Sequence, residues 1–259
     1  MKINHKILIL GGSTQASELL KQIQRYTDIQ PILSLAGTTK NPVLPENNYR
    51  IGGFGGVNGL SEYIRQNSIK ALICATHPFA AKMPFNALEA AKTTDIPLIY
   101  ILRPEWKPQK KDNWLEVNDH TQAVKFINLE TKTKSPKIFL TVGRLELAQY
   151  KNTNCQYLIR TIDDLVEKPL ENSIYITARP PFSVDDEINI MKKHKIDFLV
   201  TKNSGGKATE AKLTAARKLG IKIIMIKRPP RPDFLHVTNV KDAIEWLNIV
   251  NCLYFSLQK

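Results

Sequence analysis

Short runs of β-branched and aliphatic residues alternate with helix-length segments along the whole chain. Runs of this kind are typical of parallel strands buried on both faces, and their alternation with helices indicates βαβ units. The sequence therefore predicts an α/β fold with parallel sheets. Nine strands are expected, at 6–10, 31–36, 71–75, 98–102, 137–142, 157–161, 173–178, 198–201 and 222–226.

One expected helix covers residues 207–219. Small and aliphatic side chains recur there at spacings of three and four, for example Ala208, Ala211, Ala215 and Leu219. Gly220 follows directly, and glycine is the residue that most easily adopts the left-handed conformation that ends a helix. This pattern predicts that the helix stops at Leu219.

A weak internal repeat indicates two similar halves. Residues 75–104 align without a gap to residues 200–229, and the segment that begins at 115 echoes the segment that begins at 235. We expect two Rossmann-like domains with internal pseudo-symmetry, one over 1–104 and one over 105–259. The element at 115–129 could pack with either half. The alternative to a true internal repeat is that any two βαβ units look alike in sequence at this level.

The positive charge of the chain limits its partners. Lys and Arg number 37 against 24 Asp and Glu, a formal net charge of +13. Such an excess suits nucleic acid, an anionic membrane or a small molecule with many carboxylates or phosphates. The excess is spread along the chain, and clusters such as Lys110-Lys111 and Lys192-Lys193 have no interleaved aromatic residues. Most of these cations are therefore expected to solvate the surface.

Other features indicate a cytoplasmic protein. No apolar stretch approaches the roughly 20 residues that span a bilayer, and the first residues lead into a strand without the core of a signal peptide. The three cysteines (Cys74, Cys155 and Cys252) are scattered and odd in number, which favours reduced thiols.

Two glycine-rich segments are candidate nucleotide loops. Gly11-Gly12-Ser13-Thr14 joins the first strand to a helix, where backbone N–H groups can approach a pyrophosphate. A strand-to-helix turn also needs glycine for geometric reasons alone, and the full G-x-G-x-x-G pattern is absent. Residues 51–56 hold four glycines around Phe54, which leaves backbone amides exposed beside one aromatic ring. A plain flexible loop is the alternative there.

Two further segments follow expected strands, at the edge where open α/β sheets bind their ligands. Residues 75–80 contain His77, which titrates near neutral pH, whereas a packing role is the alternative. Residues 200–207 bring two glycines and two lysines to a helix start, which suits an anion, although the spacing is not that of a Walker A loop. Arg144 and Arg179 end neighbouring strands and could bind carboxylates. No metal site is expected, because Cys74 and His77 have no second ligand pair.

Together these loops resemble one family, the precorrin-6A reductases of cobalamin (corrin-ring) biosynthesis. The likeness runs from about residue 6 to about residue 250. The matching residues are Ile9 to Gly12, Ser34 to Gly37 with Asn41 to Pro45, Arg50 to Gly56, Ala75 to Ala80, Arg103-Pro104, Thr141 to Arg144 and Thr201 to Gly206. Two stretches depart from the family pattern: Gln15-Ala16-Ser17 at the first helix, and Thr38-Thr39-Lys40, where the family usually has arginine.

The resemblance implies reduction of one double bond of the precorrin-6A or cobalt-precorrin-6A macrocycle by hydride from NADPH, with NADH left open, to give precorrin-6B. It assigns cofactor binding to Gly11, Gly12, Ser13, Thr14, Gly37, Gly53, Phe54, Gly55, Thr76, Pro78 and Phe79. It assigns substrate binding to Arg144, Arg179, Lys202, Asn203, Ser204, Gly205, Gly206 and Lys207. His77 is the one candidate acid, and Lys40 could replace the missing arginine at the 2′-phosphate.

The resemblance also implies that cofactor and substrate bind in the cleft between the two domains. The implied partner is a tetrapyrrole with many carboxylates, and other corrin-pathway enzymes are potential partners. Nucleic acid and membranes are not expected. The sequence keeps two alternatives open: a basic α/β module that binds a polyanion without catalysis, and a nicotinamide-dependent reductase of another carboxylated molecule. No G-x-S-x-G, H-E-x-x-H or paired carboxylates support hydrolysis.

Overall fold

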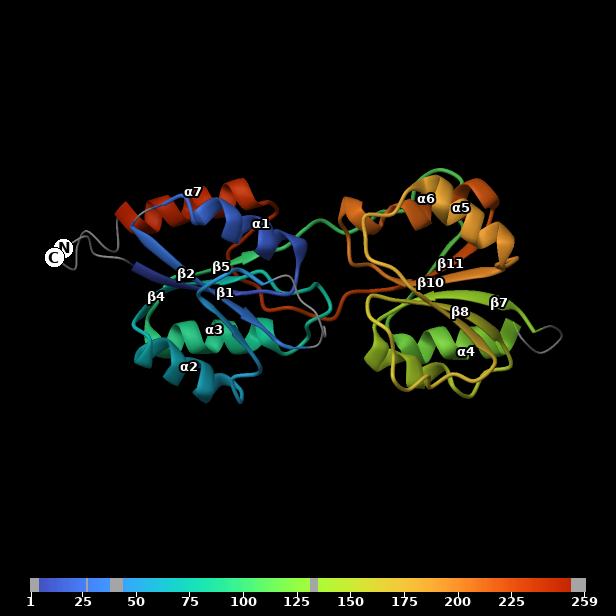
Figure 1. The fold of residues 1–259 in the computed structure, drawn as a ribbon, viewed down its shortest axis with the longest axis horizontal. Coiled ribbons are helices and arrows are strands. Elements are labelled where there is room, and N and C mark those ends of the chain that lie inside the picture. The colour runs from blue at the N-terminus through green and yellow to red at the C-terminus, as the bar shows by residue number, and fades with distance from the viewer. Residues whose placement is uncertain (1–4, 27, 38–43, 131–134, 253–259) are drawn as a thin grey trace. The chain divides into compact units, whose positions relative to one another are not determined.

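The chain folds into two compact α/β units, which are visible in the computed structural model (Figure 1). The structure describes residues 5–26, 28–37, 44–130 and 135–252. One unit consists of Met1–Pro104 and Pro229–Lys259, and the other of Glu105–Arg228. The chain therefore leaves the first unit after Pro104 and returns to it after Arg228.

The first unit is a parallel six-stranded sheet between two helical layers. Its strand order is β12-β5-β4-β1-β2-β3. Helices α1 and α7 lie on one face and α2 and α3 on the other (Figure 1). The strands are β1 (His5–Leu10), β2 (Ile29–Leu35), β3 (Tyr49–Ile51), β4 (Ile69–Cys74), β5 (Leu98–Ile101) and β12 (His236–Val237). The helices are α1 (Thr14–Ile23), α2 (Val57–Gln66), α3 (Met83–Thr94) and α7 (Val240–Val250).

The second unit repeats this plan with the strand order β6-β11-β10-β7-β8-β9, again all parallel. Helices α5 and α6 cover one face, and α4 with the 3₁₀ helix η1 covers the other (Figure 1). Its strands are β6 (Trp114–Val117), β7 (Lys137–Thr141), β8 (Gln156–Thr161), β9 (Ser173–Thr177), β10 (Phe198–Lys202) and β11 (Lys222–Ile226). Its helices are α4 (His120–Glu130), η1 (Arg144–Tyr150), α5 (Val184–Lys193), η2 (Lys207–Thr209) and α6 (Ala211–Leu219).

The nine predicted strands are confirmed, with ends that differ by one or two residues. Strands β3, β6 and β12 were missed because they are three, four and two residues long and are partly exposed at sheet edges. The predicted helix at 207–219 is split into η2 and α6. It ends as expected at Gly220, whose φ of 68° is left-handed.

The two units exchange their last strand and helix. After β5 of the first unit, the chain forms β6 and α4 in the second; after β11 of the second, it forms β12 and α7 in the first. The predicted C-terminal domain, 105–259, is therefore wrong beyond residue 228. The cause is packing: β12 pairs with β5, and the apolar face of α7, including Val240 and Leu247, is buried with Ile99 and Ile101.

The predicted pseudo-symmetry is confirmed by the strand order, since β1 to β5 and β12 correspond in order to β7 to β11 and β6. The gapless alignment of the repeat is wrong in detail. It places Tyr100 opposite Met225 and, extended by one residue, Cys74 opposite Leu199. Cys74 pairs with Tyr100, but Met225 pairs with Thr201, two positions beyond Leu199.

Candidate active site

Each sheet has a point at which the strand order turns back, between β1 and β4 in the first unit and between β7 and β10 in the second. In open parallel sheets this switch point leaves a crevice at the carboxyl ends of the strands, where ligands bind. The residues after β1 and β4 are Gly11 to Thr14 and Ala75 to Phe79, and Lys202 ends β10 with Asn203 to Lys207 after it. Three of the four predicted loops therefore lie at the two switch points, whereas the glycine-rich loop at 51–56 follows the outer strand β3.

The glycine turn after β1 is held tightly against its neighbours. A Cβ at Gly11 would lie 2.8 Å from Leu33 Cδ1, and Gly12 has a φ of +117°. Ser13 caps α1: its Oγ accepts a hydrogen bond from the Ala16 N–H at 3.2 Å and donates one to the Ala75 carbonyl at 2.7 Å. The Ser13 side chain thus joins the turn to the end of β4, and the start of α1 keeps backbone N–H groups for an anion.

The loop after β4 lies directly against this turn. A Cβ at Gly12 would be 3.9 Å from the His77 backbone nitrogen. The Nδ1 of His77 accepts the Phe79 N–H at 3.2 Å, so in this arrangement the imidazole proton is on Nε2. The Thr76 side chain is buried, with its hydroxyl 3.7 Å from Cys74 Sγ. Cys74 is fully buried in the sheet core, and burial raises the pKa of its thiol.

Sequence reasoning missed Arg231, which enters this site with the returning chain. Its Nη2 donates to the His77 carbonyl at 3.0 Å, and its buried Nε has no hydrogen-bond partner among the described residues. Burial lowers the pKa of Arg231, while Cys74 and Tyr100 oppose that shift. A contact between residues so distant in sequence leaves no local signal.

The glycine-rich loop after β3 is organised by Arg50. The Arg50 Nη1 donates to Ser34 Oγ at 2.8 Å and to the Gly52 carbonyl at 2.9 Å, and Nη2 donates to the Gly53 carbonyl at 2.9 Å. The guanidinium also stacks 3.8 Å above the Phe54 ring. These contacts argue against the alternative of a plain flexible loop, because three hydrogen bonds and a cation–π contact fix its first half.

The second half of this loop presents bare backbone. Gly55 and Gly56 have φ values of +79° and +96°, and a Cβ at either position would meet no atom within 4 Å. Gly56 is the N-cap of α2 and supplies no side-chain hydrogen bond to the first turn of that helix. Gly37, at the carboxyl end of β2, also has a positive φ of +79°. Backbone donors therefore gather along one edge of the first sheet.

At the second switch point, charged side chains lie beside glycines, since Gly205 and Gly206 after β10 have φ values of 65° and 86°. Lys202 Nζ lies 2.9 Å from Glu146 Oε1, and the Glu146 carboxylate occupies the space that a side chain at Gly143 would need. Arg179 follows the outer strand β9, which β8 separates from β7, so the prediction that Arg144 and Arg179 end neighbouring strands is wrong. Arg179 forms an ion pair with Asp163 at 2.6 Å. Arg144 and Lys207 are exposed. Two of the four predicted substrate-binding cations thus have carboxylate partners within the protein, which reduces the local positive charge.

The Asn203 side chain is used inside the protein. Its Oδ1 accepts the Trp106 N–H at 2.9 Å and its Nδ2 donates to the Trp106 carbonyl at 3.0 Å, while Arg228 Nε donates to the Asn203 carbonyl at 2.8 Å. Asn203 is 3 % exposed. It anchors the segments on which the chain enters and leaves the second unit, and its amide is therefore removed from the predicted substrate-binding set.

Near the same edge lies a pair that sequence reasoning did not single out. His120 begins α4, and its Nδ1 lies 2.9 Å from the hydroxyl oxygen of Tyr150, which ends η1. The two rings meet edge to face, with centroids 5.8 Å apart. Burial lowers the pKa of His120 and raises that of Tyr150. Both groups are therefore uncharged at neutral pH.

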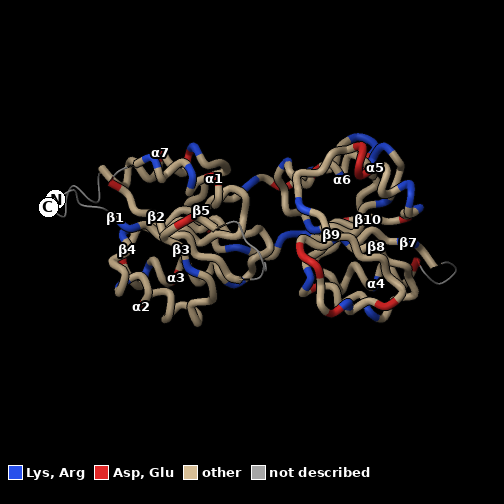
Figure 2. The backbone as a smooth tube through the Cα atoms, viewed as in Figure 1, with Lys and Arg blue, Asp and Glu red and all other residues tan. Residues whose placement is uncertain are grey.

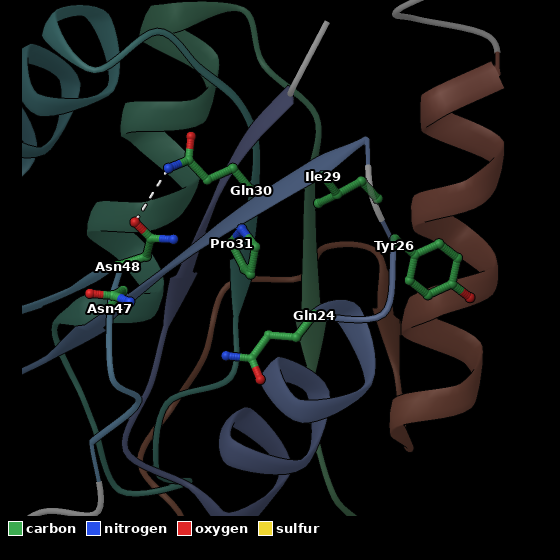
Figure 3. Close-up of a pocket in the computed structure, with 7 residues that line it drawn as sticks. All are labelled: Gln24, Tyr26, Ile29, Gln30, Pro31, Asn47 and Asn48. Carbon is green, nitrogen blue, oxygen red and sulfur yellow. Dashed lines mark hydrogen bonds between the residues drawn. The ribbon is translucent and has the colours of Figure 1, made fainter. Parts of the chain in front are cut away.

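A polar pocket of about 280 Å³ lies elsewhere, at the amino end of β2 (Figure 3). Gln30 Nε2 donates to Asn48 Oδ1 at 3.3 Å within it. Its lining residues are Gln24, Tyr26, Ile29, Gln30, Pro31, Asn47 and Asn48. Because Ile29 begins β2, the pocket is at the opposite edge of the sheet from the switch point, and it contains none of the predicted site residues.

The basic residues are distributed over both units without one dominant cluster (Figure 2). This agrees with the expectation that most of them solvate the surface. Across the described ranges, no helix is long and apolar enough to cross a membrane. Cys74, Cys155 and Cys252 are all free thiols. Thr38, Thr39 and Lys40, at which the family arginine is replaced, lie outside the described residues, as do Asn41 to Val43.

The strand order, the glycine turn at the first switch point and the open start of α2 together define a Rossmann-like dinucleotide-binding protein with a second unit of the same fold. A family model described as "Precorrin-6x reductase CbiJ/CobK" matches residues 6–248. The chain belongs to this family, and it is a reductase of the cobalamin pathway that uses a nicotinamide cofactor.

Individual relatives agree with this assignment. The chain is 42% identical to a precorrin-6A reductase of Rhodococcus erythropolis, over 93% of this chain and 97% of that protein. It is 27% identical to a cobalt-precorrin-6A reductase of Priestia megaterium, over 86% of this chain and 90% of that protein. A solved structure of CobK precorrin-6A reductase matches with a TM-score of 0.86 at 35% identity, over 94% of this chain and 96% of that one.

Proposed function

We propose that this protein reduces cobalt-free precorrin-6A to precorrin-6B with NADPH. The observation that carries the proposal is the pair of switch points, one lined by backbone donors and one by charged side chains, in a chain 42% identical to a precorrin-6A reductase. Relatives named precorrin-6A reductase are 36% to 42% identical, whereas those named for the cobalt form are 25% to 27% identical. This difference favours the substrate without cobalt.

The dinucleotide is assigned to the first unit. Gly11 to Thr14 and the start of α1 would receive the pyrophosphate, because a helix N-terminus and bare backbone amides stabilise negative charge. Gly53 to Gly55, with Gly37 beside them, would flank the remainder of the dinucleotide, and Thr76, Pro78 and Phe79 would contact the nicotinamide. Arg50 is bonded to its own loop, so Lys40 is the residue that we assign to the 2′-phosphate.

The tetrapyrrole is assigned to the second unit. Its rim carboxylates would bind Arg144 and Lys207, which are exposed, and Lys202 and Arg179, which would exchange a carboxylate of the protein for one of the ligand. Ser204, Gly205 and Gly206 would add backbone and hydroxyl donors. An inter-domain cleft that holds both ligands stays a prediction.

The protein contributes orientation and a proton to the chemistry. When bound, the nicotinamide supplies hydride to one carbon of the macrocycle. The loop from Ala75 to Phe79 would hold the two reactants in near-attack geometry, which can lower the barrier by several kcal/mol. His77 would be the acid that protonates the adjacent carbon. For this it must be the imidazolium, so Nδ1 would have to release the Phe79 N–H that it accepts in this structure. In His77→Ala, turnover should fall; unaltered turnover and pH dependence would remove His77 from this role.

The direct test is oxidation of NADPH and of NADH by the purified protein with precorrin-6A, with and without cobalt, followed by absorbance. We expect turnover with cobalt-free substrate and a lower KM for NADPH than for NADH. Absence of turnover with every combination would refute the proposal. The alternative of a polyanion-binding module predicts DNA binding with a steep salt dependence instead, and the distribution of charge does not favour it.

A further inference from the structure

The position of His120 has a counterpart in the first unit that carries a different residue. Val117 in β6 pairs with Ile226 of β11, as Val237 in β12 pairs with Ile101 of β5. Counting on three residues from each valine gives His120 at the start of α4 and Val240 at the start of α7. The exchanged elements thus place a histidine in one unit where the other has valine.

In the first unit this position is purely a packing position. Val240 is 4 % exposed and belongs to the apolar core formed by α1, α7 and the sheet. A histidine at the equivalent site of the second unit is partly buried, and burial disfavours its charged form. Valine could fill this packing position, but it would leave the buried hydroxyl of Tyr150 without an acceptor and would offer no second polar atom at the ligand-facing edge.

Tyr150 fixes the hydrogen-bonding state of His120. The Tyr150 side chain is fully buried, and its hydroxyl contacts His120 Nδ1 at 2.9 Å. A buried tyrosine hydroxyl needs an acceptor for its proton, and Nδ1 is the acceptor at this site. The imidazole therefore carries its own proton on Nε2. That nitrogen has no hydrogen-bond partner within the described parts of the chain and is not among their buried unpaired atoms.

The groups around His120 lie at the ligand-facing edge. Glu146 of η1 and Lys202 of β10 form the ion pair described above, and both act electrostatically on His120. Lys202 lowers the pKa of His120 in addition to burial, whereas Glu146 and Asp119 oppose the shift. At neutral pH the imidazole is thus a neutral donor beside a lysine that already has a carboxylate partner.

We propose that His120 binds the substrate through Nε2–H, as a hydrogen-bond donor to one rim carboxylate of the tetrapyrrole beside Lys202. Tyr150 is a positioning residue that holds the ring in the required tautomer. This inference rests on the proposed function, because it assumes a substrate rich in carboxylates at the second unit. It adds a neutral donor to a site at which two of the cations are already paired within the protein.

The test replaces His120 with the residue of its counterpart. Titration of His120→Val with precorrin-6A, followed by absorbance, should show a Kd raised about 10-fold or more, as expected for loss of a hydrogen bond to a charged acceptor. The NADPH Kd should stay within about twofold of the wild type. The free energy of unfolding should fall, because the buried hydroxyl of Tyr150 loses its acceptor. Tyr150→Phe should raise the precorrin-6A Kd by a smaller factor, about 3-fold.

The matched control is His194→Val, because His194 lies in the same unit but follows α5 before β10, at the amino end of that strand. It should leave the precorrin-6A Kd unchanged. An unchanged Kd in His120→Val, or a reduced kcat with unchanged affinity, would overturn the proposal. Binding of precorrin-6A by a wild-type protein that does not reduce it would refute the proposed function alone, since the Kd comparison does not need turnover.

Discussion

The two units share one path and present different chemistry at the same place. The carboxyl edge of the first sheet has glycines with positive φ and helix starts, such as Gly12, Gly55 and Gly56. The equivalent edge of the second sheet also has glycines with positive φ, but it adds charged side chains, including Lys202 and Glu146. The comparison shows that strand order sets where a ligand binds, whereas the loops set which ligand it is.

The largest expected effect comes from a side chain in the bare backbone of the first unit. In Gly55→Ala a methyl group would enter the open side of the loop, and the dinucleotide Kd should rise about 100-fold because backbone donors could no longer approach the phosphates. Precorrin-6A binding should not change. Isothermal titration with NADPH and absorbance titration with precorrin-6A measure the two constants.

Gly220→Ala is the matched control for that variant. Gly220 also has a positive φ, +68°, with no atom within 4 Å of its Cβ position, but it ends α6 away from the ligand edge. Both substitutions should cost about 1 kcal/mol of stability, and only Gly55→Ala should weaken the dinucleotide. Equal dinucleotide Kd values in the two variants would contradict the assignment of this loop.

Arg50→Met should have the next largest effect. It removes three hydrogen bonds and the stack on Phe54, so the loop should lose its fixed shape and the NADPH KM should rise about 30-fold. The control is Arg65→Met, which removes an exposed contact to the Thr93 carbonyl in the same unit. If Arg50→Met raises the precorrin-6A KM as much as the NADPH KM, the loop does not form the binding site of the dinucleotide alone.

Arg231→Met tests the exchange between the units. Loss of its hydrogen bond to the His77 carbonyl should loosen the loop after β4 and raise the NADPH KM about 10-fold, with partial recovery in Arg231→Lys. Arg228→Met removes the corresponding contact in the second unit, to the Asn203 carbonyl, and should raise the precorrin-6A KM instead. If both variants raise the KM of the same ligand, the two arginines do not hold the loops of two separate binding sites.

Lys202 and Glu146 should respond in opposite directions. Lys202→Met should raise the precorrin-6A KM about 5-fold, and Glu146→Gln should lower it about 2-fold, since the lysine would no longer be shared with a carboxylate of the protein. Steady-state kinetics at fixed NADPH measure both. A raised KM in Glu146→Gln would mean that the carboxylate orients Lys202 rather than competing with the substrate.

The smallest effect concerns pH. Burial lowers the pKa of His120 below its ordinary value of 6.5 in the folded protein, so the unfolded chain binds the proton more tightly. The neutral imidazole of His120 therefore contributes its full share to the stability of the folded protein above pH 6.5. This contribution is lost as the pH falls through the lowered pKa of His120. Denaturant unfolding of the wild type should show this loss at acid pH, and His120→Val should show less of it. An identical pH profile in both proteins would contradict the burial of the imidazole.

Much of the fold could be predicted because long apolar strands leave a clear local pattern, as at β1 and β10. The exchange of β12 and α7 could not, because a two-residue strand has no periodicity and local sequence does not indicate which sheet a strand joins. Nor could the two-residue shift between the repeats, because it appears only in the strand pairing: Cys74 pairs with Tyr100, whereas Thr201 pairs with Met225.

The candidate site divides in the same way. The glycine-rich loop from Gly52 to Gly56 could be predicted as part of the site, because a run of glycines costs conformational entropy on folding unless the backbone needs their conformational freedom. Arg231 was not, since its partner is a backbone carbonyl far away in sequence. Asn203 looked like a ligand group beside two glycines, but burial and its contacts with Trp106 give it an internal role. Such contacts exist only in three dimensions.

The central claim is that each unit binds its own ligand at its own switch point. Hydrogen exchange of the backbone amides, measured with NADPH alone and with precorrin-6A alone, tests it most directly. NADPH should protect 11–14, 52–57 and 75–79, and precorrin-6A should protect 143–146 and 202–207. Protection of the same segments by both ligands, or of the residues around Gln24 and Asn48 instead, would contradict the claim.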